Sequence, residues 1–135
     1  MTRVTAREVV EVAARQFQLT PAQLRGPDLS DYFCNARFVT FKVIRELCPH
    51  VSLPVMGELF NERHHTTVLS GLRRADLLVR HDTKFRAAYH ELFDAVVVAV
   101  RARLDAEVAA AEARLEALKS ERATYAPRPK ELQGA

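Results

Sequence analysis

The sequence predicts an all-α protein: a helix-turn-helix bundle followed by a long C-terminal helix with a coiled-coil pattern. Three observations predict it. Ala, Leu, Val, Arg and Glu dominate, and only four Gly and six Pro interrupt the 135 residues, a composition that favours helix. Apolar residues recur three and four positions apart along most of the chain. Residues that cap helices stand before these segments. A hydrophobic content of 48% is enough for a packed core.

The first two predicted helices carry similar start signals. Thr5 precedes Glu8 by three residues, which is the spacing of a capping box. The apolar face that follows consists of Val9, Val10, Ala13 and Phe17. Thr20 then stands before Pro21, and proline is favoured at the first helical position. Gly26-Pro27 ends this second, short helix.

A third helix is predicted to begin at Ser30 or Asp31 and to run to about Cys48, because Pro49 stops it. One stripe of this helix collects residues at helical spacing. The stripe is apolar except for Arg37 and Thr40, and its members are Phe33, Ala36, Arg37, Thr40, Phe41, Ile44 and Leu47. An arginine on or beside an inner stripe indicates a specific role.

Two helices joined by a tight turn are predicted next. The first begins after Ser52, and the second begins near Arg63–His65. The segment "FNER" between them is typical of a turn, because Asn61 tolerates a left-handed conformation. Gly57 costs its helix about 1 kcal/mol relative to Ala unless close packing requires it. Such a pair forms a helix-turn-helix, and the second helix has an apolar face made of Val68, Leu69, Leu72, Ala75, Leu78 and Val79.

Asp82 or Thr83 can cap a last, long helix. Its apolar residues alternate between spacings near four and three, which is a heptad-like seam. They are Phe85, Tyr89, Leu92, Val96, Val100, Leu104, Val108, Ala111, Leu115 and Leu118. A continuous helix of this length would measure about 60 Å. The second half is rich in Ala and charge, so it either pairs with another helix or projects into solvent.

The positive charge is modest overall and concentrated locally. The formal net charge is +3, which by itself implies no nucleic-acid partner. From Arg63 to Arg86, however, six Arg or Lys residues stand against two Asp. This segment is either a basic patch or an ordinary solvated helix face.

Cysteine usage and hydropathy exclude some classes of protein. Cys34 and Cys48 both lie in apolar helical patterns, which indicates small buried residues rather than a disulfide pair. The first seventeen residues carry regularly spaced charges and do not form a signal peptide. The longest uncharged apolar run, around "DAVVVAVR", is too short to cross a bilayer. We expect a cytoplasmic protein that does not contact membranes.

The segment "RHHTT", Arg63 to Thr67, has three possible interpretations. A metal site needs ligands on one helix face, but the adjacent His64 and His65 point about 100° apart and no nearby Cys or carboxylate completes a tetrahedron. Nucleophilic catalysis needs an oriented hydroxyl, and nothing around Ser70 marks an elbow or an oxyanion hole. In the first turn of a recognition helix, in contrast, every residue type of this segment can contact bases or phosphates. The simplest alternative is a polar N-terminal turn capped by Thr66 or Thr67.

The stretch "ELCPHVSLPVMGELFNERHHTTVLSGLRR" resembles a known signature, approximately E-L-T-x-x-S-L-P-x-I-G-x-x-F-G-G-R-D-H-T-T-V-L-H-A. This is the signature of the C-terminal DNA-binding domain (domain IV) of the bacterial chromosomal replication initiator DnaA. The resemblance extends without gaps over about residues 5 to 93. Matching positions are Glu46, Leu47, Ser52, Leu53, Pro54, Gly57, Phe60, Arg63, His65, Thr66, Thr67, Val68 and Leu69.

The resemblance implies roles for individual residues. His65 and Thr66 would read bases in the major groove, and Thr67, Arg37 and Arg45 would hold phosphates. Arg63 would stabilise or contact the same edge. The full set of residues for which we expect DNA contact is Arg37, Arg45, Ser52, Arg63, His64, His65, Thr66, Thr67, Ser70, Arg73 and Arg74. No catalytic residue, metal ligand or cofactor is expected.

Three positions depart from the family pattern. His64 stands where the family has an acidic residue, and Ser70 replaces the family's second base-contacting histidine. Leu29 occupies the position of an arginine that the family inserts into the minor groove, and it lies between Asp28 and Asp31. Acidic side chains there would repel phosphates. The 135 residues also contain neither an ATPase domain nor a Walker motif, so we expect them not to remodel an origin alone.

We therefore expect a helix-turn-helix DNA-binding domain at residues 1–93, a helical extension for oligomer or partner contacts at 94–124, and a disordered tail at 125–135. The predicted function is sequence-specific binding of double-stranded DNA to regulate transcription or replication initiation, near the nucleoid, without a small-molecule substrate. The partner of the extension would be a second copy or another helical protein. The alternative is a DnaA-like adaptor that acts through protein contacts with little specific DNA binding.

Overall fold

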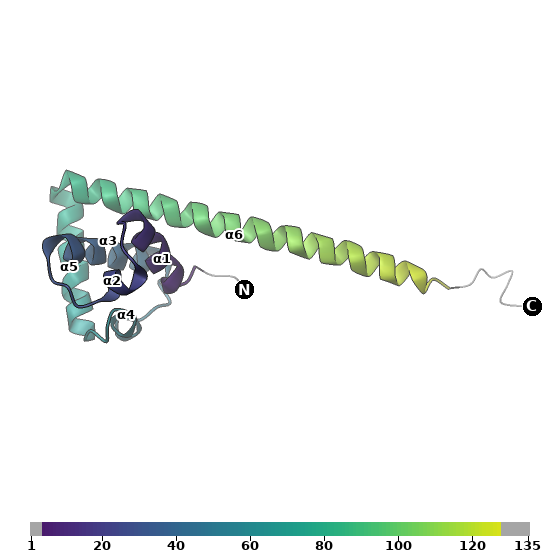
Figure 1. The fold of residues 1–135 in the computed structure, drawn as a ribbon, viewed down its shortest axis with the longest axis horizontal. Helices are drawn as coiled ribbons and strands as arrows, with labels where there is room; N and C mark the ends of the chain where they lie inside the picture. Colours follow the sequence, from purple (N-terminus) through teal and green to yellow (C-terminus); the bar gives the residue numbers. More distant parts are fainter. Residues whose placement is uncertain (1–3, 128–135) are drawn as a thin grey trace, which may run out of the picture. The chain divides into compact units, whose positions relative to one another are not determined.

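The computed structural model describes residues 4–127, and it contains helices but no strand in that part of the chain. The helices are α1 (Ala6–Gln16), α2 (Pro21–Arg25), α3 (Asp31–Leu47), α4 (Leu53–Leu59), α5 (His65–His81) and α6 (Thr83–Thr124) (Figure 1). The predicted all-α fold with its helix-turn-helix is confirmed.

Local start signals explain where the first helices begin. Thr5 and Thr20 both form complete capping boxes, with Glu8 and Gln23 as their partners. Each box satisfies amide groups that the first turn of a helix leaves free. Ser30 is the residue before α3, but its side chain makes no capping hydrogen bond. Its amide instead donates to Oδ1 of Asp28 at 2.8 Å.

The chain divides into two compact units, residues 1–100 and 101–135. The predicted boundary between residues 93 and 94 falls inside the first unit, where Val96 is fully buried. The second unit contains the C-terminal part of α6, and each residue from Asp105 to Pro127 is exposed. Most of the tail predicted to be disordered, residues 128–135, lies outside the described residues.

Helix α3 forms the centre of the first unit, where it packs against α1, α2 and α5, and α4 packs against α5. The crossing of α3 with α5 is close because Gly71 presents no side chain to Phe41 and Phe38. Phe41 also meets Phe60 edge to face at 4.7 Å between ring centroids. The first turns of α6 complete the core with Phe85, Tyr89, Leu92 and Val96.

An ion pair also links α3 to α5 at the edge of this core. Nζ of Lys42 lies 2.8 Å from Oδ1 of Asp76. Burial disfavours the charge of Lys42, but the hydrogen bond to Asp76 and the nearby negative groups outweigh it and raise its pKa. Asp76 is thus engaged by Lys42 and is less able to repel an approaching anion.

Candidate DNA-binding site

The turn between α4 and α5 uses two left-handed residues. Asn61 has φ 61°, as its residue type predicts, and Glu62 has φ 53°. A left-handed conformation is uncommon for glutamate, so its residue type does not predict this conformation. The two residues reverse the chain within a short distance and deliver Arg63 to the start of α5.

Gly57 allows this turn to lie directly against α4. A Cβ atom built on Gly57 would stand 1.9 Å from the carbonyl oxygen of Arg63. The backbone of Arg63 lies this close to Gly57 because the amide of Arg63 donates a hydrogen bond to the carbonyl of Gly57 at 2.8 Å. Close packing therefore requires a glycine at position 57. This requirement explains why α4 contains a glycine despite its cost to helix stability.

Arg63 ties the turn to the end of α2. Its Nη1 donates to the carbonyls of Phe60 at 2.7 Å and Arg25 at 2.9 Å, and its Nη2 donates to the carbonyl of Gly26 at 2.6 Å. Burial, followed by the charge of Arg37, lowers the pKa of this guanidinium. The side chain is half-buried and bound to main-chain acceptors, so it positions the start of α5.

His64 is the N-cap of α5, a role that its residue type does not predict. Its Nδ1 accepts the amide hydrogen of Thr66 at 3.2 Å and lies 2.8 Å from the Thr66 hydroxyl. The rings of His64 and His65 are 4.1 Å apart at an angle of 35°. An acceptor before the first turn is the property that aspartate also supplies. A histidine can therefore stand where the resemblance places an acid.

The first turn and outer face of α5 are open to solvent. His65, Thr66 and Thr67 are exposed, as are Ser70 and the residues Arg73 and Arg74. Thr66, Ser70 and Arg73 follow one another at intervals of four and three, so they share one face. The buried residues of α5 are Val68, Gly71, Leu72 and Ala75, and they occupy the opposite side. A donor-rich edge thus lies along the solvent side of α5.

Arg45 lies near this edge, on α3. Arg45 and Arg73, both exposed, line one hollow of about 230 Å³ together with Lys42. Ser52 is exposed too, but its hydroxyl accepts the amide hydrogen of Val55 at 3.3 Å and caps α4. The structure therefore brings Arg45 next to the residues of α5, while Ser52 already has a structural partner.

Arg37 is buried, whereas the predicted phosphate contact requires an exposed side chain. Only 3% of the residue is exposed, and its Nε donates to the carbonyl of Leu24 at 2.8 Å. Burial lowers the pKa of the guanidinium, and Cys34 and Asp28 partly oppose that shift. Nη2 is buried without a hydrogen-bond partner. A side chain in this position cannot reach a phosphate at the surface, so Arg37 has a structural role here.

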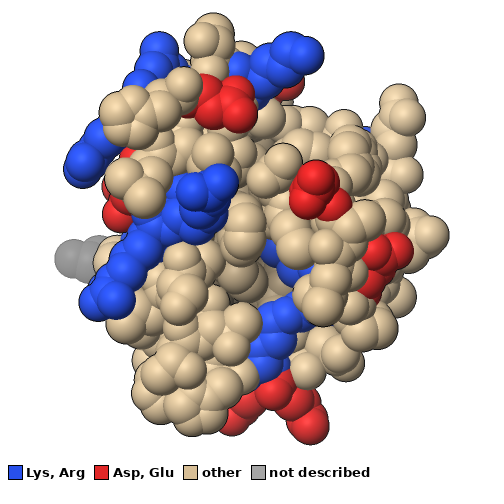
Figure 2. Space-filling model, turned by 90° about the vertical axis from the view of Figure 1, so that its left-hand side faces the viewer, with Lys and Arg blue, Asp and Glu red and all other residues tan. Residues whose placement is uncertain are grey.

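Charge on this side of the molecule is mixed. Figure 2 views the left-hand side of Figure 1, where α5 lies, and shows Lys and Arg side chains spread over the face with acidic side chains among them. Arg86 belongs to the predicted basic segment, but it donates to the carbonyls of Val79 and Arg80 and closes the end of α5. The exposed cations of this segment that make no such main-chain bonds are therefore Arg73, Arg74, Arg80 and Lys84.

The loop between α2 and α3 presents an apolar tip. Leu29 is 76% exposed, and Tyr32, in the first turn of α3, is 54% exposed. Hydrogen bonds from Ser30 lower the pKa of the neighbouring Asp28 carboxyl, so this carboxylate is charged at neutral pH. The loop therefore offers leucine and negative charge at the position where the resemblance implies a minor-groove arginine.

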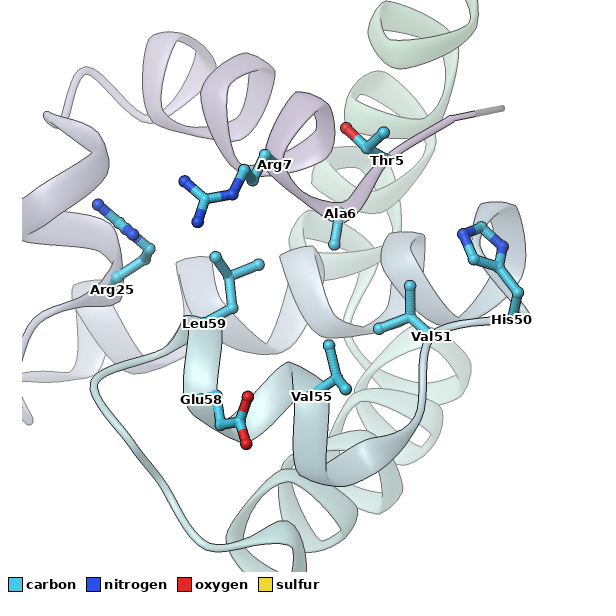
Figure 3. Close-up of a pocket in the computed structure, with 9 residues that line it drawn as sticks. All are labelled: Thr5, Ala6, Arg7, Arg25, His50, Val51, Val55, Glu58 and Leu59. Atoms are coloured by element: carbon cyan, nitrogen blue, oxygen red, sulfur yellow. The ribbon is translucent and has the colours of Figure 1, made fainter. Parts of the chain in front are cut away.

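A separate hollow of about 510 Å³ lies between α1 and α4. Figure 3 shows Val55 and Leu59 of α4 beside Ala6, with the side chains of Arg7, Arg25 and Glu58 around them. None of the residues predicted to contact DNA lines it. Among residues 4–127, no group of three or more His, Cys, Asp or Glu could hold a metal ion, and no helix has the length and hydropathy to cross a membrane.

The comparison with protein families decides the class of this helix-turn-helix. The family model described as "Bacterial dnaA protein helix-turn-helix" matches residues 6–75, which is more than half of the chain. The chain belongs to this bacterial DnaA family. The predicted resemblance to the DnaA C-terminal domain is thereby confirmed, and the matched region runs from α1 into α5.

Individual relatives agree with this family. The chain is 38% identical over 71 residues to the chromosomal replication initiator protein DnaA of Corynebacterium jeikeium, covering 53% of this chain and 12% of the relative. It is 31% identical over 88 residues to the protein of that name from Thermus thermophilus, covering 65% and 20%. For Wolinella succinogenes the identity is 24% over 89 residues, covering 66% and 20%. The chain spans a fifth or less of the length of these curated relatives.

Proposed function

We propose that this chain binds double-stranded DNA in a sequence-specific manner and regulates transcription or replication initiation. The observation that carries the proposal is the exposed His65-Thr66-Thr67 turn at the start of α5. Gly57 and Arg63 fix the backbone beneath this turn. The relatives named chromosomal replication initiator protein DnaA support the setting in DNA replication. The chain would act near the nucleoid without catalysis or a cofactor.

The contacts divide into base reading and phosphate binding. His65 and Thr66 lie in the first turn of α5, the part of a recognition helix that reaches base edges. Their donors and acceptors, with the Thr66 methyl group, suit the major groove. Thr67, Arg45, Arg73 and Arg74 would hold phosphates on either side. Arg63 and Arg37 serve the fold, and Ser52 and Ser70 would make secondary contacts.

Recovery of bound genomic fragments, followed by binding assays on the enriched sequence, tests the proposal. With three arginines on phosphates, the logarithm of the binding constant should fall against the logarithm of salt concentration with a slope of about −3. Thr66→Ala should reduce discrimination between target and random DNA by about 1–3 kcal/mol. The control is Thr124→Ala, which changes a threonine at the end of α6. Equal loss on all sequences would show that Thr66 does not read bases.

One observation favours a second function, that of an adaptor acting through protein contacts. The loop from Gly26 to Asp31 exposes Leu29 between acidic residues, and such a surface suits a protein better than a phosphate backbone. The long α6 would then serve as a docking element for a helical partner. Absence of DNA binding at low salt would favour this adaptor and reject DNA reading.

A further inference from the structure

The second unit carries a mostly apolar seam, and the residues of this seam from Val108 onward are exposed. The seam alternates between spacings of four and three and consists of Leu104, Val108, Ala111, Leu115, Leu118, Arg122 and Tyr125. Val108 is 55% exposed, Leu115 51% and Leu118 47%. Large apolar side chains at this spacing are those that two supercoiled helices bury against each other.

We propose that this seam pairs with the same seam of a second copy of this chain, with the two helices antiparallel and Leu115 of one copy against Leu118 of the other. The inference shares with the adaptor function only the use of α6 as a contact surface. It does not depend on DNA binding. The charges beside the seam select this arrangement over its competitors.

Heptad positions define those charges. Val108, Leu115 and Arg122 occupy position a, and Leu104, Ala111 and Leu118 occupy position d. The flanking e positions are then Asp105, Glu112 and Lys119, and the flanking g positions are Glu107, Arg114 and Glu121. Residues at e and g face the partner helix and set the orientation of a coiled coil.

A parallel, in-register pair would place like charges together. In that arrangement each g residue faces the e residue of the following heptad on the partner. Glu107 would face Glu112, and Arg114 would face Lys119. Both contacts are repulsive, and two-fold symmetry makes each occur twice. The charges therefore oppose a parallel pair.

An antiparallel pair brings e residues against e residues and g residues against g residues, because the partner is turned end over end. With Leu115 opposite Leu118, Glu112 of each copy faces Lys119 of the other, and Arg114 of each copy faces Glu121 of the other. All these contacts join opposite charges. A shift of one heptad would set Glu112 against Glu112 and Arg114 against Arg114, so one register is favoured.

Arg122 supports the same arrangement from inside the seam. In a parallel pair it would meet Arg122 of the second copy at a core position. In the antiparallel pair it lies opposite Ala111, whose small side chain leaves room for the arginine stem while the guanidinium extends to water. Tyr125 then lies opposite Val108, so both ends of the seam are covered.

Charge-reversal variants of the full chain distinguish the arrangements, with sedimentation equilibrium from micromolar to millimolar protein and no DNA present. Glu112→Lys and Lys119→Glu should each weaken self-association about tenfold, because attractive contacts become repulsive. The double variant restores opposite charges and should recover the wild-type dissociation constant. Circular dichroism confirms that each variant stays helical. In a parallel pair each single change would instead strengthen association.

Glu116→Lys is the matched control, since it makes the same change of charge on the outer side of the helix. Glu116 forms an exposed ion pair with Lys119 at 3.6 Å, and its loss should leave association within about twofold of wild type. A monomeric wild-type chain at every concentration would overturn the proposal. So would stronger association of Glu112→Lys, a double variant no better than the single ones, or a control as weak as Glu112→Lys.

Discussion

The turn from Phe60 to Thr67 and the loop from Gly26 to Asp31 flank the same side chain, yet they are built differently. Arg63 bonds to main-chain carbonyls in both segments. Gly57 of α4 lets the turn pack closely, and two left-handed residues and a capping histidine fix the backbone of the turn. In the loop, Leu29 projects into solvent. Packing therefore constrains the backbone at the start of α5, whereas an exposed side chain of the loop such as Leu29 is free to differ.

The largest expected effect on stability comes from a substitution that disrupts the turn between α4 and α5. Gly57→Ala places a Cβ where the carbonyl oxygen of Arg63 stands, 1.9 Å away, and backbone atoms cannot move aside cheaply. The free energy of unfolding should fall by about 3 kcal/mol or more, and DNA affinity should fall with it. Thermal denaturation followed by circular dichroism measures the loss. Glu58→Ala, at the exposed neighbour, is the control and should leave the melting temperature almost unchanged.

Substitutions of two arginines on α3 distinguish a residue that stabilises the fold from a residue that contacts phosphate. Arg37→Met should lower the free energy of unfolding by about 1–3 kcal/mol, because the carbonyl of Leu24 loses its buried donor, while the salt dependence of DNA binding keeps its slope. Arg45→Met should leave stability within about 0.5 kcal/mol and reduce the slope by about 0.9. Binding titrations over a range of salt concentrations measure both. A smaller slope for Arg37→Met would return that residue to the phosphate contacts.

A substitution in the loop from Gly26 to Asp31 tests whether this loop approaches DNA. Leu29→Arg adds a cation at an exposed site without touching the core, so stability should change by less than about 0.5 kcal/mol. If the loop lies near DNA, the salt slope should steepen by about 0.9 as one more phosphate is neutralised. Val98→Arg, also exposed but on α6 and away from the proposed DNA contacts, is the matched control. No difference between the two variants would mean that the loop does not approach the duplex.

A last pair of changes concerns the cap of α5. His64→Asp keeps an acceptor for the Thr66 amide and adds negative charge at the positive end of the helix dipole. The free energy of unfolding should rise by about 0.5–1 kcal/mol at neutral pH, measured by urea denaturation. His64→Ala removes the acceptor and should lower it by about 1 kcal/mol. Equal stability of all three proteins would show that His64 does not act as a cap.

Sequence patterns predicted what depends on neighbours along the chain. Thr5 and Glu8 lie three residues apart, and the structure contains the capping box that this spacing predicts. Thr20 was predicted as a cap, and the structure adds Gln23 as its partner. The place of Gly57 in a short helix showed that only close packing would justify a glycine there, and the structure meets this condition. Arg37 could not be placed in this way, because its acceptor is a carbonyl thirteen residues earlier in another helix. The role of Arg63 in joining α2 to the turn likewise depends on tertiary contacts.

His64 shows a different limit. Its position before the first turn of α5 was visible in the sequence, but histidine is not among the residues that usually cap helices. The bond from the Thr66 amide to Nδ1 depends on the orientation of the ring. The exposed edge of α5 followed from helical spacing, while its contacts with DNA stay a prediction.

The bonds of Arg63 have a consequence for how this domain can diverge. All three of its acceptors are main-chain carbonyls, and every amino acid supplies one. Replacement of the side chain at position 25 therefore leaves its acceptor in existence, provided the backbone path is kept. The side chains of the loop beside α5 can therefore change, as at the exposed Leu29, without a compensating change at position 63.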